Sequence, residues 1–166
     1  MTSTSSGHLD TDGQFMITQT SSWIFNADAK AGLLLAALAV LGAALTGQLQ
    51  STLRGYLVFG VREVAGLVLF AVAAAMLGIS VFYIYRVLVP RLDETSSESR
   101  FSWPWVSQQA LDLIFRREPG GVRREAWVQA VALSGIARAK FSAFRAALQF
   151  AIIGSVFLLA GSVVGF

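Results

Sequence analysis

The sequence predicts an all-α integral membrane protein with three transmembrane helices, a small cytoplasmic helical module and a long helix that continues into the last span. Of its 166 residues, 55% are hydrophobic and only 14% are charged. Soluble domains carry about 25% charged residues, so this chain is too poor in charge to coat a globule with water-facing groups. The charges are also unevenly spread, and three stretches have none.

The charge-free stretches lie between Lys30 and Arg54, from Val64 to Tyr85 and from Ala146 to Phe166. A helix rises about 1.5 Å per residue, so roughly twenty residues cross a hydrocarbon core of about 30 Å. The stretches lack the alternating pattern of barrel strands, which favours helices. The alternative is a soluble bundle of three buried helices, but too little polar surface remains to cover them.

These stretches divide the chain into six segments. We expect a disordered leader over residues 1–13, a helix running into transmembrane helix 1 over 14–49, an outer loop over 50–63, transmembrane helix 2 over 64–89, a cytoplasmic linker with a short helix over 90–121, and over 122–166 a long helix that is cytoplasmic first and then forms transmembrane helix 3. A weak helical stripe leads into the first span, formed by Phe15, Thr18, Ser22, Phe25 and Ala29. The long, acidic-leaning leader does not resemble a signal peptide, so we expect the first span to be retained.

The basic residues predict the orientation in the membrane. Ten of the thirteen Lys and Arg residues lie between Arg86 and Arg145. Because loops rich in Lys and Arg stay in the cytoplasm, this segment is expected there. With three spans, the N-terminus is then cytoplasmic and the C-terminus lies outside.

Most catalytic chemistry is excluded by composition. The chain has no cysteine and a single histidine, His8, which removes Cys-ligated metal sites and most histidine-based catalysis. It also contains no P-loop, dinucleotide-binding turn, HExxH or nucleophile elbow. No acidic residue lies within the spans, which argues against a proton relay. We therefore expect no enzyme, no metal and no cofactor.

The best candidate site is a group of arginines around the Pro119-Gly120-Gly121 turn, far from the spans in sequence: Arg116, Arg117, Arg123 and Arg124. Arginine pairs well with phosphate, and a tryptophan such as Trp127 offers a face on which a base can stack. An alternative interpretation is that the tryptophans pack the short helix against the long helix. Topology and anionic lipid alone account for the basic residues closer to the membrane. The segment lacks any motif that reads DNA or RNA.

A second group of candidates lies where the chain enters the first span. Asn26 and Lys30 are one helical turn apart and share a face, and Asp28 lies between them. The plainer interpretation of Asp28 is a capping or interfacial role beside Lys30. Lys140, on the long helix, completes the candidate set, and Arg124, Arg138 and Arg145 share one stripe of that helix with Val131.

Small residues four positions apart occur in every span: Ala36-Val40-Ala44, Ala74-Gly78, Ala147-Ala151-Ser155 and Gly161-Gly165. Such faces permit close approach of helices in lipid. Three helices alone enclose no useful pore, so a channel would need several subunits.

Three stretches resemble the Pycsar transmembrane effectors (PycTM), in the order that family has them. Residues 27–34 (ADAKAGLL) are similar to its AD-x-KA-x-x-LL opening, and Pro90-Arg91-Leu92 to the PRL that closes its second span. Gln129, the run LSGIA over 133–137 and Lys140 are similar to the segment before its last span. The resemblance covers about residues 14–166.

The resemblance implies a role in anti-phage defence at the bacterial inner membrane. A pyrimidine cyclase makes cCMP or cUMP, the effector responds, membrane integrity is lost, and the infection is abortive. The resemblance carries over no ligand residues, so the cationic segment remains our candidate site, within one chain or between subunits of a homo-oligomer. A membrane scaffold without a ligand and a nucleotide-independent channel-like protein stay open as alternatives.

Overall fold

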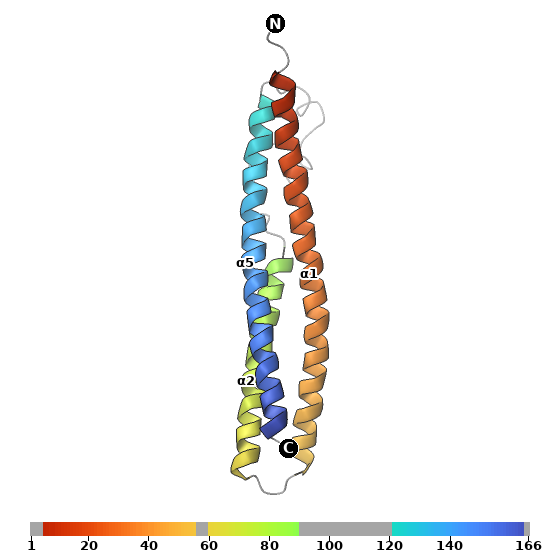
Figure 1. Cartoon of the computed structure of the whole chain (residues 1–166), viewed down its shortest axis with the longest axis vertical. Helices are drawn as coiled ribbons and strands as arrows, with labels where there is room; N and C mark the ends of the chain where they lie inside the picture. The colour runs from red at the N-terminus through yellow and green to blue at the C-terminus, as the bar shows by residue number, and fades with distance from the viewer. Residues whose placement is uncertain (1–4, 56–59, 90–120, 165–166) are drawn as a thin grey trace. The chain divides into compact units, whose positions relative to one another are not determined.

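The computed structural model consists of long α-helices, and it describes residues 5–55, 60–89 and 121–164 (Figure 1). The side chains of residues 5–11, 52, 54, 55 and 121–123 lie outside this description. Three helices occur in the described part of the chain, which contains no strand: α1 (Ser5–Gly55), α2 (Val61–Leu88) and α5 (Gly121–Val164). All three are long and apolar enough to cross a membrane. The predicted fold class is therefore confirmed, whereas the short helix expected within 90–121 falls almost entirely outside the described residues.

The first helix begins earlier than the sequence suggests. We expected a disordered leader over residues 1–13, but α1 is helical from Ser5 onward. The physical reason lies at Gly13, which is buried against Ala126 of α5. Once a packed stretch of helix exists, each further turn costs little, because the unfavourable nucleation step has been made. The helix therefore extends past Gly13 toward the N-terminus.

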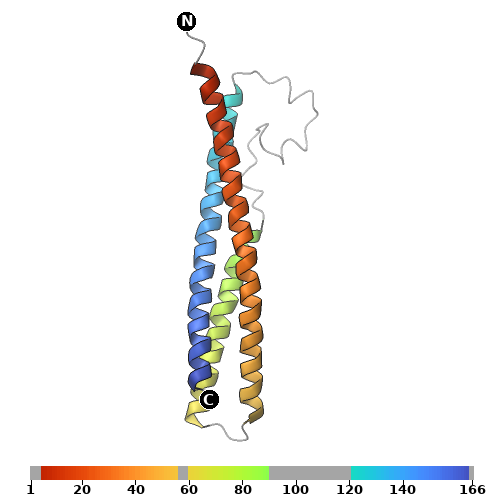
Figure 2. The same cartoon turned by 45° about the vertical axis from the view of Figure 1, so that its right-hand side comes forward.

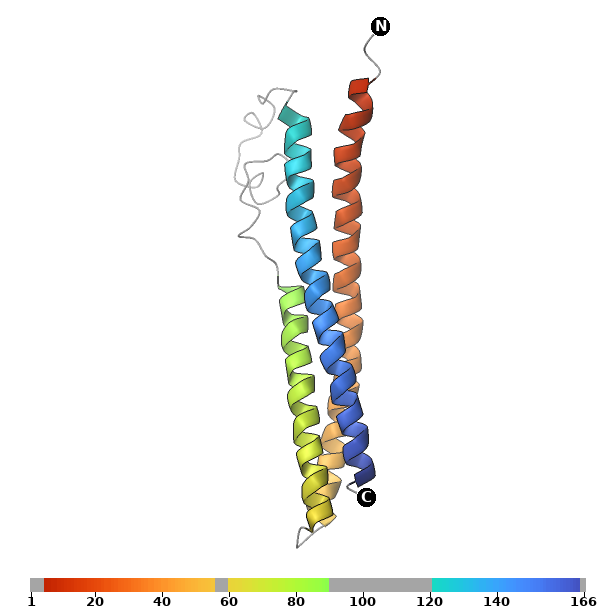
Figure 3. The same cartoon turned by 60° about the vertical axis from the view of Figure 1, so that its left-hand side comes forward.

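The chain forms two compact units. Unit 1 contains residues 1–27 and 89–140, and unit 2 contains residues 28–88 and 141–166. In unit 1, α1 and α5 lie side by side and run in the same direction, as Figures 2 and 3 show from two sides. In unit 2, α2 runs antiparallel to the other two helices (Figure 3). Unit 2 therefore contains the charge-free stretches, and unit 1 contains the described residues of the candidate site on α5.

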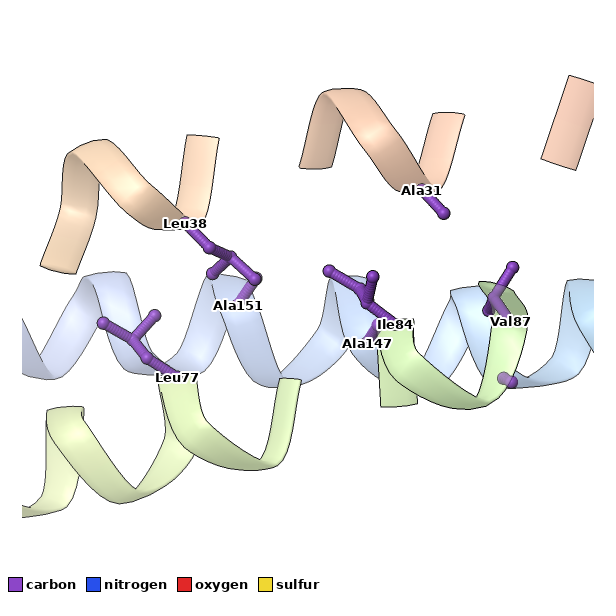
Figure 4. Packing of buried hydrophobic residues seen from close by; sticks show 8 residues of the cluster. Ala31, Leu38, Leu77, Ile84, Val87, Ala147 and Ala151 are labelled. Carbon is purple, nitrogen blue, oxygen red and sulfur yellow. The ribbon is translucent and has the colours of Figure 1, made fainter. Parts of the chain in front are cut away.

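The core of unit 2 follows from a seven-residue repeat on α2. Its buried residues alternate at spacings of four and three: Gly66, Phe70, Ala73, Leu77, Ser80, Ile84 and Val87. This repeat keeps one face of a helix turned toward its neighbours, as in a left-handed coiled coil. Figure 4 shows Leu77, Ile84 and Val87 of this face lying between the helices. They form one cluster with Leu38 of α1 and with Ala147 and Ala151 of α5.

Small residues let α5 approach α2 closely within unit 2. A Cβ placed on Gly154 would lie 2.9 Å from Leu77 Cδ2, and one on Gly161 would lie 2.8 Å from Phe70 Cε1. A hydrogen bond joins the same two helices, since the buried Ser80 hydroxyl donates to the carbonyl of Ala147 at 2.7 Å. The rings of Tyr83 and Phe150 stack with centroids 5.7 Å apart. Side-chain packing and hydrogen bonding thus both hold α2 against α5.

The ends of α2 carry local signals that fit its bounds. Its first turn contains Glu63 and its last turn Arg86, the charges that complement the helix dipole. It ends at Leu88, two residues before Pro90, because a residue that precedes proline disfavours helical geometry. Arg62 also donates from Nε to the carbonyl of Val164 at 2.8 Å. That bond satisfies a carbonyl in the last turn of α5, which has no partner within the helix.

The predicted small-residue faces divide into two groups. Ala147, Ala151 and Gly161 of α5 are buried in unit 2, as close helix packing requires. The stretch Ala36-Val40-Ala44 on α1 and the pair Ala74-Gly78 on α2 are instead exposed. A Cβ on Gly78 would meet nothing within 4 Å. Spacing alone therefore does not identify which small residues pack inside the bundle.

Candidate functional site

Unit 1 contains a seam between α1 and α5, which we call the α1–α5 seam. It consists of the buried residues of unit 1: Gly13, Thr20 and Ala27 on α1, and Ala126, Gln129, Ala130, Ile136, Ala137 and Lys140 on α5. The α1 residues are seven positions apart, and those on α5 follow one another at spacings of one, three and six. Such spacings place each set along one stripe of its helix. Most members are small, so the two backbones approach closely.

A close contact of this seam lies at Gly13. A Cβ added there would lie 3.2 Å from Ala126 Cβ and 3.7 Å from Trp127 Nε1. The indole of Trp127 therefore lies against α1 at the edge of the seam, although 40% of this residue remains exposed. Trp127 therefore both packs against α1 and keeps an exposed surface. At this position, helix packing and stacking with a base are compatible.

Two polar groups are buried in the seam without a hydrogen bond. Thr20 is 0% exposed and Gln129 is 5% exposed. Thr20 Oγ1 and Gln129 Oε1 have no hydrogen-bond partner in the described part of the chain. Leaving such a group buried and unpaired costs about 1–3 kcal/mol, because its bond to water is lost without replacement. A seam of this composition is therefore less stable than one with apolar residues at both positions.

Five other hydroxyls of the described helices bond within their own helix. Thr18, Thr46, Ser134, Ser155 and Ser162 each donate to the carbonyl four residues earlier, at 2.7 to 3.0 Å. This bond allows a helix to carry a hydroxyl in an apolar setting. The Thr20 hydroxyl has no such bond, although Thr20 lies only two residues from Thr18. Thr20 is buried, whereas Thr18 is exposed. Its position in the seam thus distinguishes it from its neighbour.

The predicted arginine group is described in part. Arg116 and Arg117 lie outside the described residues, and Arg123 lies in the first turn of α5 with its side chain outside the description. Arg124 is exposed, as is Trp127 one helical turn later. Residues three positions apart on a helix are neighbours, so the guanidinium and the indole lie on one face. The described part of the group thus offers a positive charge next to an aromatic face.

The remaining candidates lie elsewhere in the chain. Lys140 is buried at 7% exposure, and thirteen residues, about 20 Å of helical rise, separate it from Trp127. Asn26 and Lys30 are exposed one turn apart on α1, while Asp28 is half-buried. With Gly13 beside Ala126 in a parallel pair, Asn26 also lies about 20 Å along the helices from Arg124. The structure therefore does not bring Lys140 or Asn26 next to Arg124 and Trp127.

The helical stripe predicted on the N-terminal part of α1 does not form the buried face. Phe15 is 65% exposed and Phe25 is 76% exposed, and Thr18, Ser22 and Ala29 are exposed as well. The buried face contains Gly13, Thr20 and Ala27 instead. The physical reason is that small residues allow closer contact with α5 than phenylalanines would. The predicted stripe therefore has helical spacing, but it lies on the exposed face of α1 and not on the buried one.

Sequence reasoning missed Thr20 altogether and did not count Gln129 among the site residues. A usable signal was present in both helices. Gly13, Thr20 and Ala27 recur every seven residues, and Gln129 lies on the same stripe as Ala126, Ala130 and Leu133. A threonine and a glutamine at positions otherwise held by Gly, Ala and Leu are exceptions to the pattern, and such exceptions point to function.

The comparison with known families gives one match. The Pycsar effector protein domain (PycTM) matches residues 13–166. No curated protein and no solved structure matches the chain. The matched region includes all of α2 and α5, and α1 from Gly13 onward, so it contains both the apolar spans and the α1–α5 seam. The chain is therefore a multi-pass membrane protein that belongs to the Pycsar effector protein domain family.

Proposed function

We propose that this protein is the membrane effector of an anti-phage Pycsar system, which cCMP or cUMP activates to impair membrane integrity and cause abortive infection. The family match over residues 13–166 carries the proposal. The three helices that are long and apolar enough to cross a membrane support the proposal, because an effector that impairs membrane integrity must reach the bilayer. This family is not a known enzyme family, and we propose no catalytic residue.

The proposed orientation follows from the distribution of charge. Ten of thirteen Lys and Arg residues lie between Arg86 and Arg145, so we place this segment and the N-terminus in the cytoplasm of a bacterial cell. The C-terminus then lies outside the inner membrane. This arrangement exposes the α1–α5 seam to the compartment in which a cyclase partner makes its product.

The proposed ligand site centres on Arg124 and Trp127. A cyclic mononucleotide carries one negative charge and one base, so one or two arginines and an aromatic ring suffice to bind it. Arg124 and Trp127 are exposed on one face of α5, and Arg116, Arg117 and Arg123 lie near them in sequence. No separate cofactor or metal is needed for this binding.

A pore that impairs membrane integrity would require more than one chain. Three helices enclose no pore of their own, so we propose that the effector acts as a homo-oligomer in the lipid bilayer. A ligand that binds one arrangement of the long helices more tightly shifts the population toward it. Because α1 and α5 contribute to both units, such a shift in unit 1 reaches residues that belong to the spans.

Leakage from dye-loaded liposomes tests the proposal. The purified protein is reconstituted, its fold and orientation are checked, and cCMP, cUMP, cAMP and cGMP are added separately at micromolar concentrations. We expect leakage with a pyrimidine nucleotide and not with the purines. The double variant Arg123→Ala, Arg124→Ala should lose the response, whereas Arg138→Ala should keep it, because Arg138 is exposed on the same helix about 20 Å away.

Two results would contradict the proposed effector function, and a third would contradict only the proposed ligand site. Silence with all four nucleotides favours a scaffold without a ligand. Leakage without any nucleotide favours a constitutive channel-like protein. An unchanged response in the double variant would show that the nucleotide binds elsewhere, while leaving the effector role intact.

A further inference from the structure

The α1–α5 seam contains two buried oxygen atoms that the chain itself does not satisfy. Thr20 Oγ1 and Gln129 Oε1 have no hydrogen-bond partner among the described residues, although both side chains are more than nine-tenths buried. Neighbouring hydroxyls such as that of Thr18 bond to the preceding turn of their own helix. The seam therefore contains polar chemistry that serves no visible purpose in the packing of the two helices.

The register of the helix pair places these two residues close together along the seam. Gly13 lies beside Ala126, and the helices run in the same direction (Figure 2). Gln129 follows Ala126 by three residues, and Thr20 follows Gly13 by seven. The difference is four residues of helical rise, about 6 Å, which is similar to the width of a nucleobase.

The atoms involved select the kind of group that can satisfy them. A glutamine Oε1 only accepts hydrogen bonds, whereas a threonine hydroxyl both donates and accepts. A phosphate would place its own negative oxygens against Oε1, which is unfavourable. An uncharged edge that carries N–H donors beside acceptors fits both residues, and the edge of a nucleobase is such a group.

We infer that Thr20 and Gln129 bind the base of the activating nucleotide when the α1–α5 seam parts. The inference rests on the proposed function and adds the residues that recognise the base of the nucleotide. The seam is composed mainly of Gly and Ala, so little apolar contact is lost when it opens. The nucleotide replaces that contact with hydrogen bonds and thereby favours the open arrangement.

Two apolar substitutions of similar size test this inference. Thr20→Val and Gln129→Met remove the polar atoms and keep the side-chain volumes. Thermal unfolding of the full-length protein in detergent, without nucleotide, should show equal or higher stability for both variants. Binding of cCMP and cUMP by calorimetry should weaken at least tenfold. Thr18→Val and Gln14→Met are matched controls at exposed positions of α1 and should bind like the wild type.

The conservative variant Thr20→Ser keeps the hydroxyl and should keep most of the affinity, which separates a hydrogen bond from a change of shape. If the apolar variants bind nucleotide as tightly as the wild type, the inference fails and the effector function stands. If they unfold at lower temperature than the wild type, the two side chains serve the fold, and the inference fails as well. If the wild type binds none of cCMP, cUMP, cAMP and cGMP, the proposed function fails together with it.

Discussion

Gly154 lies where α5 passes close to α2 within unit 2. A Cβ at this position would lie 2.9 Å from Leu77 Cδ2 and 3.3 Å from the backbone nitrogen of Leu77. A flexible side-chain end can move aside, but a helix backbone moves only with its whole element. The absence of a side chain at Gly154 is therefore a condition for the packing of the two helices.

We predict that Gly154→Leu separates α5 from α2 and lowers stability, since overpacking of a tight contact costs about 1–3 kcal/mol. The measurement is thermal unfolding of the purified protein in detergent. Gly78→Leu is the matched control, because a Cβ at Gly78 meets nothing within 4 Å. Equal melting temperatures for the two variants would show that the close contact at Gly154 does not contribute.

For single residues, the sequence predicts the exposure of charged and polar side chains better than it predicts contacts between helices. The exposure of Arg124, Asn26 and Lys30 follows from their charge or polarity, and the structure shows it. The burial of Thr20 and Gln129 does not follow from their chemistry, since polar residues are mostly exposed. Their environment depends on which face of each helix meets the other, and that choice involves residues more than one hundred positions apart.

Among the helices, the positions of the spans are the most predictable feature. The expected transmembrane helix 2 covers residues 64–89, and α2 covers Val61–Leu88. The charge-free stretch and Pro90 are strong local signals, so the bounds agree closely. The buried face of such a helix is much harder to predict, because its apolar residues lie all around it and leave no polar side as a guide. Small residues do not identify it either, because Ala74 and Gly78 of α2 are exposed whereas Phe70 is buried.

The hydrogen bond between α2 and α5 gives a prediction at this scale. Ser80 is fully buried and donates to the carbonyl of Ala147 on the other helix, whereas Ser155 donates within α5 to Ala151. Interhelical bonds of this kind in membranes contribute about 0.6 kcal/mol on average. Ser80→Ala should therefore destabilise the bundle by roughly this amount, and Ser155→Ala should be nearly neutral.

Reversible unfolding in mixed micelles measures both values. The alanine at position 80 fits the same space, so a loss of stability reports the hydrogen bond and not a cavity. A larger loss for Ser155→Ala than for Ser80→Ala would contradict the assignment of the interhelical bond as the stabilising one.

For the molecule as a whole, α1 is the least covered of the three helices. Within the most apolar window of each helix, 6% of the residues of α1 are buried, against 28% for α2 and for α5. Its exposed face in unit 2 contains small residues at spacings of three and four: Ala29, Gly32, Ala36, Ala39, Ala43 and Thr46. The buried residues of α2 recur at the same spacings of three and four. In a homo-oligomer, as we propose, this face of α1 is available for a second copy.

Cysteine cross-linking tests that arrangement, because the chain contains no cysteine of its own. We predict that Ala36→Cys and Ala43→Cys form disulfide-linked dimers in native membranes under mild oxidation. Ala37→Cys and Ala44→Cys are exposed alanines at the same depth, each rotated by about 100° from its neighbour, and should stay monomeric. Equal cross-linking at all four positions would indicate random collision, and α1 would then face lipid. Cross-linking confined to Ala36 and Ala43 would place α1 at the centre of the oligomer, where a change in the α1–α5 seam acts on every subunit at once.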